Sequence, residues 1–123
     1  MTSLLTSAIY PQYAVPELVI FRERPVLMQV NAKELARELL TTKDFQCFSA
    51  LMVKESHWQD AKNPTSTASG VGQLLDSSYR NLGMKRSKST VAQTVAALAY
   101  IGRHYGSGGP CAAWNFSKTN GFY

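Results

Sequence analysis

A glutamate near the end of an apolar stretch is the residue best placed to do chemistry. Phe45–Val53 has the apolar content of a buried helix, and Glu55 comes two residues later. The carbonyl end of a helix disfavours negative charge and the nearby Trp58 favours desolvation, so both effects raise the pKa of the carboxyl. Such an acid can protonate a leaving oxygen, as cleavage of a glycosidic bond requires. An isolated glutamate is more often a solvated helix end or a partner of Lys54 or Lys62.

Few other carboxylates could assist Glu55. A glycosidase that uses water normally needs a second carboxylate as nucleophile or base. After residue 40 the candidates are Asp44 at the far end of the same helix, Asp60 in a predicted loop and Asp76 on the next predicted helix. Neither Asp60 nor Asp76 lies in a motif, which favours a mechanism with one carboxylate. Both stay open as the base of a hydrolase.

Three motifs accompany the acid at suggestive distances. Glu55 is followed by Ser56, then a loop rich in small residues, the turn Gly70-Val71-Gly72-Gln73, and later Ala112-Ala113-Trp114-Asn115. Over about residues 45–123 this pattern resembles lytic transglycosylases of the soluble lytic (SLT) type, which share the goose-lysozyme fold. Their pattern is Glu-Ser, a glycine-rich turn ending in Gln, and Ala-Tyr-Asn. Here tryptophan stands where that family has tyrosine, which keeps an apolar wall but removes a hydroxyl.

The resemblance implies an activity and a site. In that family one glutamate acts first as acid and then as base, while the 6-hydroxyl of muramic acid attacks C1 and gives a 1,6-anhydro product from peptidoglycan. Glu55 would be this catalytic residue. The implied substrate-binding residues are Ser56, Gly70, Gly72, Gln73, Tyr100, Trp114 and Asn115. We expect Gln73 and Trp114 to line the sugar groove and the two cysteines to lie outside it. The alternatives are a lysozyme-type hydrolase and a catalytically silent structural or adaptor protein of a virion.

The pattern along the chain predicts an all-α domain from residue 31 to 123, compact and lysozyme-like. Asn31 can cap a first helix with Glu34 reaching back, and a second begins near Thr42. A loop reaches Gly72, and a short helix is predicted for 73–82. A long helix follows, capped by Ser89 or Thr90 and stopped by Gly106, and Pro110 opens a last helix through Phe116.

Residues 1–30 differ from the rest. They are apolar, broken by Pro11, Pro16 and Pro25, and predicted to be an extended arm that docks on a partner or another protomer. Met1–Tyr10 has no Lys or Arg, so a secretory signal is not expected. Together with the compact domain, this favours a phage protein carried in the virion, in the tail or ejected with the genome, that acts in the periplasm or cell wall.

Charge and cysteine content set further expectations. Residues 1–40 hold four basic and four acidic side chains, so the net charge of +5 falls on residues 41–123. A basic cluster could favour polyanions or be a solvated loop; no specific nucleic-acid binding is expected. Cys47 and Cys111 could form a bridge, since their segments approach one another in the resembling family, or be two buried thiols. No metal site or cofactor is expected, and no membrane span. The basic cluster is Arg80, Lys85, Arg86 and Lys88.

Overall fold

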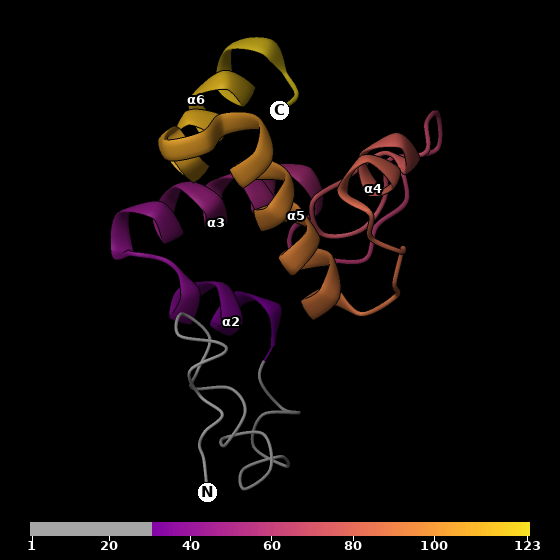
Figure 1. The fold of residues 1–123 in the computed structure, drawn as a ribbon, viewed down its shortest axis with the longest axis horizontal. Coiled ribbons are helices and arrows are strands. Elements are labelled where there is room, and N and C mark those ends of the chain that lie inside the picture. Colours follow the sequence, from indigo (N-terminus) through magenta and orange to yellow (C-terminus); the bar gives the residue numbers. More distant parts are fainter. Residues whose placement is uncertain (1–30) are drawn as a thin grey trace, which may run out of the picture. The chain divides into compact units, whose positions relative to one another are not determined.

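The computed structural model describes residues 31–123, which form one unit (Figure 1). This part of the chain is helical, and the all-α class is confirmed for it. It contains two isolated β-bridges, Lys62 with Ser69 and Ser69 with Leu74, and no longer strand. The helices are α2 (Ala32–Leu39), α3 (Thr42–Ser56), α4 (Asp76–Leu82), α5 (Thr90–Tyr105) and α6 (Gly109–Asn120), with a 3₁₀ turn η3 (Gly106–Gly108) before the last.

The first two helices begin where the capping residues predict. Asn31 accepts a hydrogen bond from the Glu34 backbone N–H at 2.8 Å, and the Glu34 carboxylate accepts one from the Asn31 N–H, which completes a capping box. Thr41 caps α3 by accepting from the Asp44 N–H at 3.1 Å. Helix α3 therefore starts one turn before Phe45. Its apolar stretch runs from Phe45 toward Glu55, which lies in the last turn.

The last two helices are joined by a glycine-rich corner. Ser89 caps α5 by accepting from the Ala92 N–H at 3.2 Å, and Gly106 ends the helix as predicted. Pro110 lies in the first turn of α6, where its missing N–H costs nothing. The predicted end of α6 at Phe116 is wrong by one turn, since the helix continues to Asn120 and stops at Gly121 in the left-handed region, φ 86°.

The short helix begins later than predicted. Gln73 has φ 54°, a left-handed conformation that cannot continue a right-handed helix, so α4 starts at Asp76 rather than at Gln73. Gly83, at φ 69°, ends it as expected. The loop before α4 is therefore three residues longer than predicted, and Gln73 and its neighbours belong to the loop rather than to the helix.

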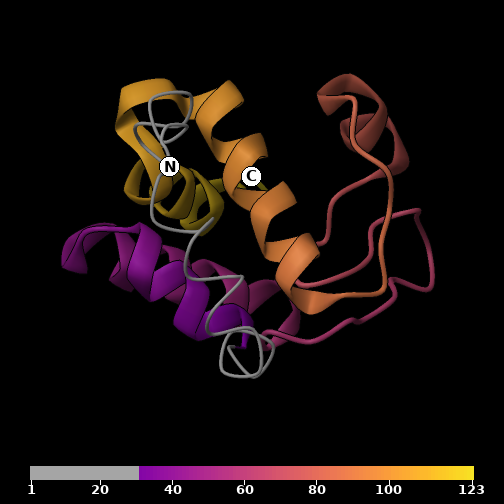
Figure 2. The same ribbon diagram turned by 60° about the horizontal axis from the view of Figure 1, so that its bottom comes forward.

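Two hydrophobic clusters meet at α5. The larger joins α2, α3, α5 and α6 around Phe48, Leu51, Met52 and Ile101, all almost fully buried. The smaller joins the loop and α4 to the other side of α5 through Leu74, Tyr79 and Ala96. Figure 2 shows α5 running between α3 and α6 on one side and the loop with α4 on the other. Helix α5 thus holds the two halves of the unit together.

Helices α3 and α6 are also joined covalently. Cys47 and Cys111 form a disulfide with their Cα atoms 4.9 Å apart, which settles the choice left open by the sequence. At the other end of the same interface the Lys54 ammonium donates to the Ser117 carbonyl at 3.0 Å and to the buried Ser117 hydroxyl. The helix that carries Glu55 is therefore fixed against α6 at two points.

The predicted arm, residues 1–30, lies outside the described residues, and so does its predicted docking. Within residues 31–123, none of the helices has the length and apolar character needed to cross a membrane.

Candidate active site

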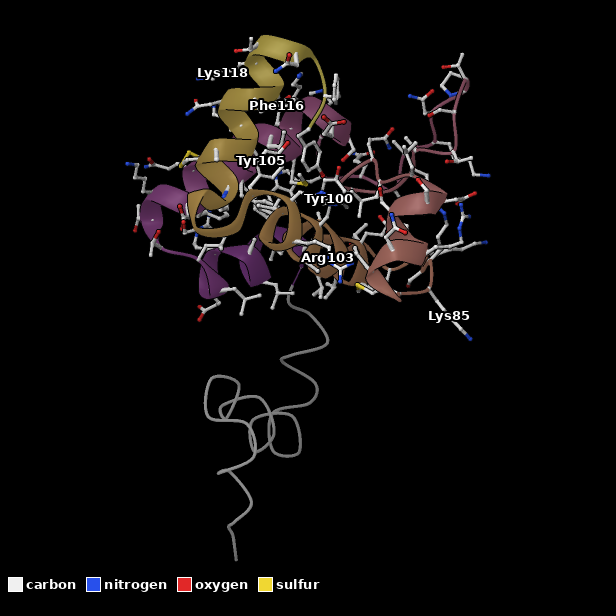
Figure 3. The ribbon with its side chains drawn as sticks, turned by 45° about the horizontal axis from the view of Figure 1, so that its top comes forward. Lys85, Tyr100, Arg103, Tyr105, Phe116 and Lys118 are labelled. Carbon is white, nitrogen blue, oxygen red and sulfur yellow. A yellow bond between two sulfur atoms is a disulfide. The ribbon has the colours of Figure 1, made fainter. Side chains whose placement is uncertain are left out.

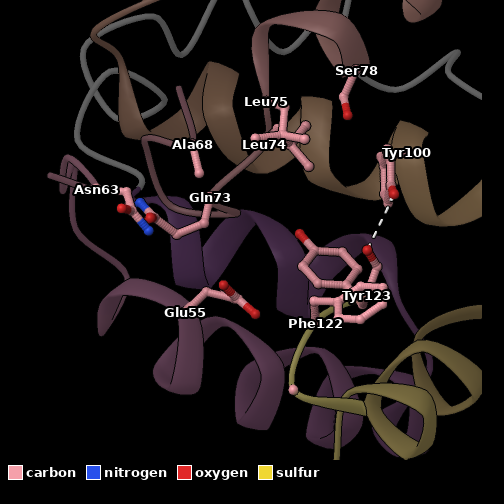
Figure 4. A pocket seen from close by; sticks show the side chains of 11 residues that line it. Glu55, Asn63, Ala68, Gln73, Leu74, Leu75, Ser78, Tyr100, Phe122 and Tyr123 are labelled. Carbon is pink, nitrogen blue, oxygen red and sulfur yellow. Dashed lines mark hydrogen bonds between the residues drawn. The ribbon is translucent and has the colours of Figure 1, made fainter. Parts of the chain in front are cut away.

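Glu55 lines a cavity of about 340 Å³ that lies between α3 on one side and α4 with its preceding loop on the other. The walls come from α3, the loop before α4, α4 itself, α5 and the segment after α6 (Figure 4). The lining residues are Glu55, Asn63, Ala68, Gln73, Leu74, Leu75, Ser78, Tyr100, Gly121, Phe122 and Tyr123. The cavity is within the size range of sites that hold small ligands, and it combines apolar walls with a few fixed polar groups.

The environment of Glu55 suits a general acid. The residue is half-buried in the last turn of α3, and its carboxyl points into the cavity (Figure 4). Burial raises the pKa of this carboxyl above its ordinary value, and the positive charge of Lys54 offsets part of that rise. The direction agrees with the sequence-based expectation. A carboxyl with a raised pKa keeps its proton at a higher pH than a solvated glutamate and can donate it.

The chain reverses sharply just after the acid. His57 and Trp58 are both left-handed, with φ 55° and 63°, a conformation that costs a non-glycine residue of order 1 kcal/mol or more. The buried Ser56 hydroxyl fixes this reversal, because it donates to the Val71 carbonyl at 2.6 Å and accepts from the Gln59 N–H at 3.2 Å. Ser56 does not line the cavity. It orients the acid by joining the end of α3 to the glycine turn.

The two motif glycines, which the resemblance implied to be substrate-binding, serve protein packing. Neither lines the cavity. A Cβ on Gly70, which also has φ 83°, would lie 2.9 Å from the Gln93 side chain. A Cβ on Gly72 would lie 2.7 Å from the Ala97 Cβ and 2.9 Å from the Tyr123 hydroxyl. These contacts are too short for any larger residue, so both glycines let the turn pack closely against α5.

Gln73 lines the cavity, but its amide nitrogen is occupied. Nε2 donates to the Ala61 carbonyl at 2.8 Å and to the Gly70 carbonyl at 3.0 Å, which uses both of its hydrogens. Only the Oε1 atom is left to accept a hydrogen bond from a ligand. The same two bonds hold the left-handed turn closed, so Gln73 is both a lining residue and a structural one.

The two aspartates that could have served as a second carboxylate are held elsewhere. Asp60 accepts from the buried Gln93 amide at 3.0 Å, and the Gln93 oxygen in turn accepts from the Val71 N–H at 2.9 Å. Asp76 pairs with Arg86 at 2.6 Å. Within the described residues Glu55 is the only carboxylate side chain that lines the cavity.

The Ala-Trp-Asn segment is placed differently from the prediction. Trp114 is half-buried against the larger hydrophobic cluster, with the Lys118 ammonium 5.4 Å from its ring centre, and Asn115 is exposed. Neither lines the cavity, so the expectation that Trp114 shares a groove with Gln73 is not met. Tyr100 does line it, and Cys47 and Cys111 do not.

Sequence reasoning missed the residues that close the cavity. Phe122 and Tyr123 follow the helix stop at Gly121, and Phe122 leaves 62% of its surface exposed. The Tyr123 hydroxyl donates to the Gly72 carbonyl at 2.7 Å. Two aromatic residues directly after a helix-stopping glycine were a usable signal, because neighbouring large apolar side chains usually pack against something. Asn63 and Ser78 gave no such signal.

The basic cluster is divided between a structural and a solvated part. Arg86 donates to the Ser69 hydroxyl at 2.5 Å and to the Thr67 and Leu74 carbonyls at 2.7 and 2.9 Å, in addition to its ion pair with Asp76. It therefore fastens the loop to α4. Lys85 is exposed and points away from the helices, as Figure 3 shows, and Arg80 and Lys88 are exposed as well.

No protein-family model matches this chain, and no curated protein or solved structure is similar enough to count as a match. What the site can do is therefore inferred from its own geometry: a desolvated carboxylic acid in a cavity of neutral polar and apolar groups, able to donate a proton and later take one back.

Proposed function

We propose that this protein is a peptidoglycan lytic transglycosylase of the lysozyme-like SLT type, which cleaves the β-1,4 bond between N-acetylmuramic acid and N-acetylglucosamine. The observation that carries the proposal is the isolation of Glu55. It is a half-buried carboxyl with a raised pKa, in a cavity where the described residues supply no second side-chain carboxylate. The motif resemblance around Glu55, the Gly70–Gln73 turn and Trp114 supports the same class.

In the proposed reaction Glu55 acts twice. Its carboxyl first donates a proton to the bridging oxygen, and the bond from that oxygen to C1 of the muramic acid breaks with the electron pair leaving on oxygen. The muramic acid 6-hydroxyl then attacks C1, and the Glu55 carboxylate takes its proton. The ring closes as a 1,6-anhydro sugar, the acid is regenerated, and no water is consumed.

The positions of the aspartates favour this route over hydrolysis. A hydrolase of the usual kind places a second carboxylate about 5–10 Å from the acid, on the other side of the sugar ring. Neither Asp60 nor Asp76 lines the cavity: Asp60 accepts from the Gln93 amide, and Asp76 pairs with Arg86.

The polar groups of the cavity suit a neutral N-acetyl sugar. The Gln73 oxygen can accept from a hydroxyl or an acetamido N–H. The Asn63 amide nitrogen can donate, whereas its oxygen already accepts from the Thr65 N–H and hydroxyl. The Ser78 hydroxyl offers both functions. Leu74, Leu75 and Phe122 supply apolar surface for the sugar faces. A few fixed polar groups on apolar walls are the usual composition of a small-molecule site.

The disulfide supports a place of action outside a reducing cytoplasm, because bridges such as Cys47–Cys111 persist in oxidising compartments such as the periplasm. The proposal extends to a phage particle that opens a local hole in the cell wall, with the arm, residues 1–30, binding another virion protein. This extension rests on the sequence alone.

The decisive experiment is mass spectrometry of muropeptides released from purified peptidoglycan. We expect 1,6-anhydro ends as the main product. Asp60→Asn and Asp76→Asn are the matched variants, and both should keep the anhydro product. Reducing ends as the main product, lost in one of these variants, would instead identify a lysozyme-type hydrolase with that aspartate as base. No products from well-folded protein on several peptidoglycan types would favour the silent structural protein.

A further inference from the structure

Tyr123 contacts both halves of the unit at the cavity. It packs against both the larger hydrophobic cluster and the smaller one. Resting on the function proposed above, we infer that Tyr123 is a positioning residue that closes the cavity beside Glu55 and fixes the turn that presents Gln73. Its side chain lines the cavity (Figure 4), and its hydroxyl bonds to the carbonyl of Gly72, the residue before Gln73.

The hydroxyl of Tyr123, together with Ala97, leaves no room for a side chain at residue 72. It donates to the Gly72 carbonyl at 2.7 Å, and a Cβ at this position would lie 2.9 Å from the hydroxyl oxygen. The turn and the phenol therefore fit only when residue 72 has no side chain. The next residue along is Gln73, so the hydrogen bond fixes the backbone from which the lining amide projects.

Helix α5 holds Tyr123 from the other side. The Tyr100 hydroxyl donates to the Tyr123 carbonyl at 3.2 Å, and the two rings meet edge to face with their centres 5.5 Å apart. The left-handed Gly121 turns the chain back after α6 so that both contacts can form. Backbone, ring and hydroxyl of Tyr123 are thus each fixed, which a residue that merely fills space would not require.

The position of Tyr123 keeps water from Glu55 without competing for its proton. Burial raises the pKa of the Tyr123 phenol well above its ordinary value, and the nearby Glu55 charge raises it further. The phenol therefore stays protonated and donates to Gly72. Lys54 on α3 is beside Glu55, and Tyr100 on α5 lines the same cavity. Tyr79 on α4 and Tyr105 on α5 are further titratable groups near Tyr123. The loop and α4 contribute only amide, hydroxyl and apolar groups to the cavity.

The first test needs no activity. NMR titration of the Glu55 side-chain carboxyl compares the parent with Tyr123→Leu, Tyr123→Phe and the control Tyr105→Phe, a half-buried tyrosine of α5 outside the cavity. We expect the Glu55 pKa to fall toward its ordinary value in Tyr123→Leu, because the smaller side chain admits water. It should change little in Tyr123→Phe, which keeps the ring, and not at all in the control. An unchanged titration in folded Tyr123→Leu would overturn the inference.

A double-mutant cycle tests the contact with the turn. Gly72→Ala should lower the thermal midpoint less in the Tyr123→Phe background than in the parent, because one of its two clashes is then gone. Strictly additive changes in the thermal midpoint would count against the inference. The cycle does not use Tyr123→Leu, so it can be interpreted even if that variant fails to fold.

Kinetics on peptidoglycan then separate positioning from plain stability. Tyr123→Phe should weaken kcat/KM roughly fivefold, the worth of one ordinary hydrogen bond. In Tyr123→Leu the basic limb of the pH profile should move to lower pH, because Glu55 loses its proton earlier. If the basic limb stays at the same pH in folded Tyr123→Leu, the positioning role of Tyr123 is refuted. If the parent shows no activity, the proposed function fails, and the titration and the cycle still decide the inference.

Discussion

Replacing Glu55 with glutamine should remove activity while leaving the fold intact. Glutamine has nearly the same shape, but its amide cannot donate and recover a proton in the way a carboxyl does. General acid–base catalysis is worth roughly 10²- to 10⁴-fold. Since Glu55 would serve both proton transfers and the described residues offer the cavity no other side-chain carboxylate, we expect a loss near the upper end. This corresponds to about 5 kcal/mol of lost transition-state stabilisation.

The same substitution should make the protein more stable at neutral pH. Burial raises the pKa of Glu55 in the folded state, so the folded protein holds this proton more tightly than the unfolded chain does. Stability must then fall as the pH rises from the unfolded pKa through the folded pKa, and above both values a constant penalty remains. Glutamine never ionises, so the variant escapes the penalty above that window and gains nothing below it.

Muropeptide release and thermal unfolding across pH test both halves of this prediction. The control is Glu38→Gln, which removes an exposed glutamate on α2 and should change neither quantity. Activity of Glu55→Gln within tenfold of the parent would mean that the acid is another residue. A stability difference that is the same at acid and neutral pH would refute the desolvation of Glu55, even if activity is lost.

Three further predictions concern the frame of the site. Removing the Cys47–Cys111 bridge with alanines should cost about 4 kcal/mol, given its 64-residue separation, and lower Tm by roughly 15–30 °C; a parent whose Tm is insensitive to reductant would contradict this. Arg86→Ala should lower the free energy of unfolding by about 1–3 kcal/mol and raise KM, because the loop loses its hydrogen bonds to Arg86. Arg86→Lys should rescue little, because lysine lacks the planar fork. Full rescue by lysine would show that charge alone matters. Trp114→Ala should lower stability by about 1–3 kcal/mol while chitooligosaccharide affinity per folded molecule stays unchanged, measured by calorimetry; a loss of affinity at unchanged stability would return Trp114 to the site.

Features set by local sequence were the ones predicted best. The caps at Asn31 and Ser89 and the stop at Gly106 are each decided within a few residues, so the helices they bound appear where expected. Glu55 was also found from local features, the apolar run before it and the motif after it. The apolar run and the motif together account for the half-buried position of the Glu55 side chain.

Features set by contacts between distant segments were missed. Gln73 looks like a helix start, but its amide bonds to Ala61 and Gly70 hold it in a left-handed turn. Trp114 looks like a sugar platform by analogy, yet the packing of α6 on α3 turns it into the larger cluster. The role of Tyr123 depends on a glycine 51 residues earlier in the chain, which no short pattern reveals.

The disulfide also gives the molecule a covalent ring. Cys47 and Cys111 enclose every cavity residue except Gly121, Phe122 and Tyr123. A single proteolytic cut in the exposed stretch 62–67 would therefore leave both fragments joined, with the acid on one piece and the Gln73 wall on the other. Nicked protein should migrate as one species on a non-reducing gel and separate only after reduction. In surroundings rich in proteases, such as a bacterial envelope, this topology lets a cleaved molecule keep its site assembled.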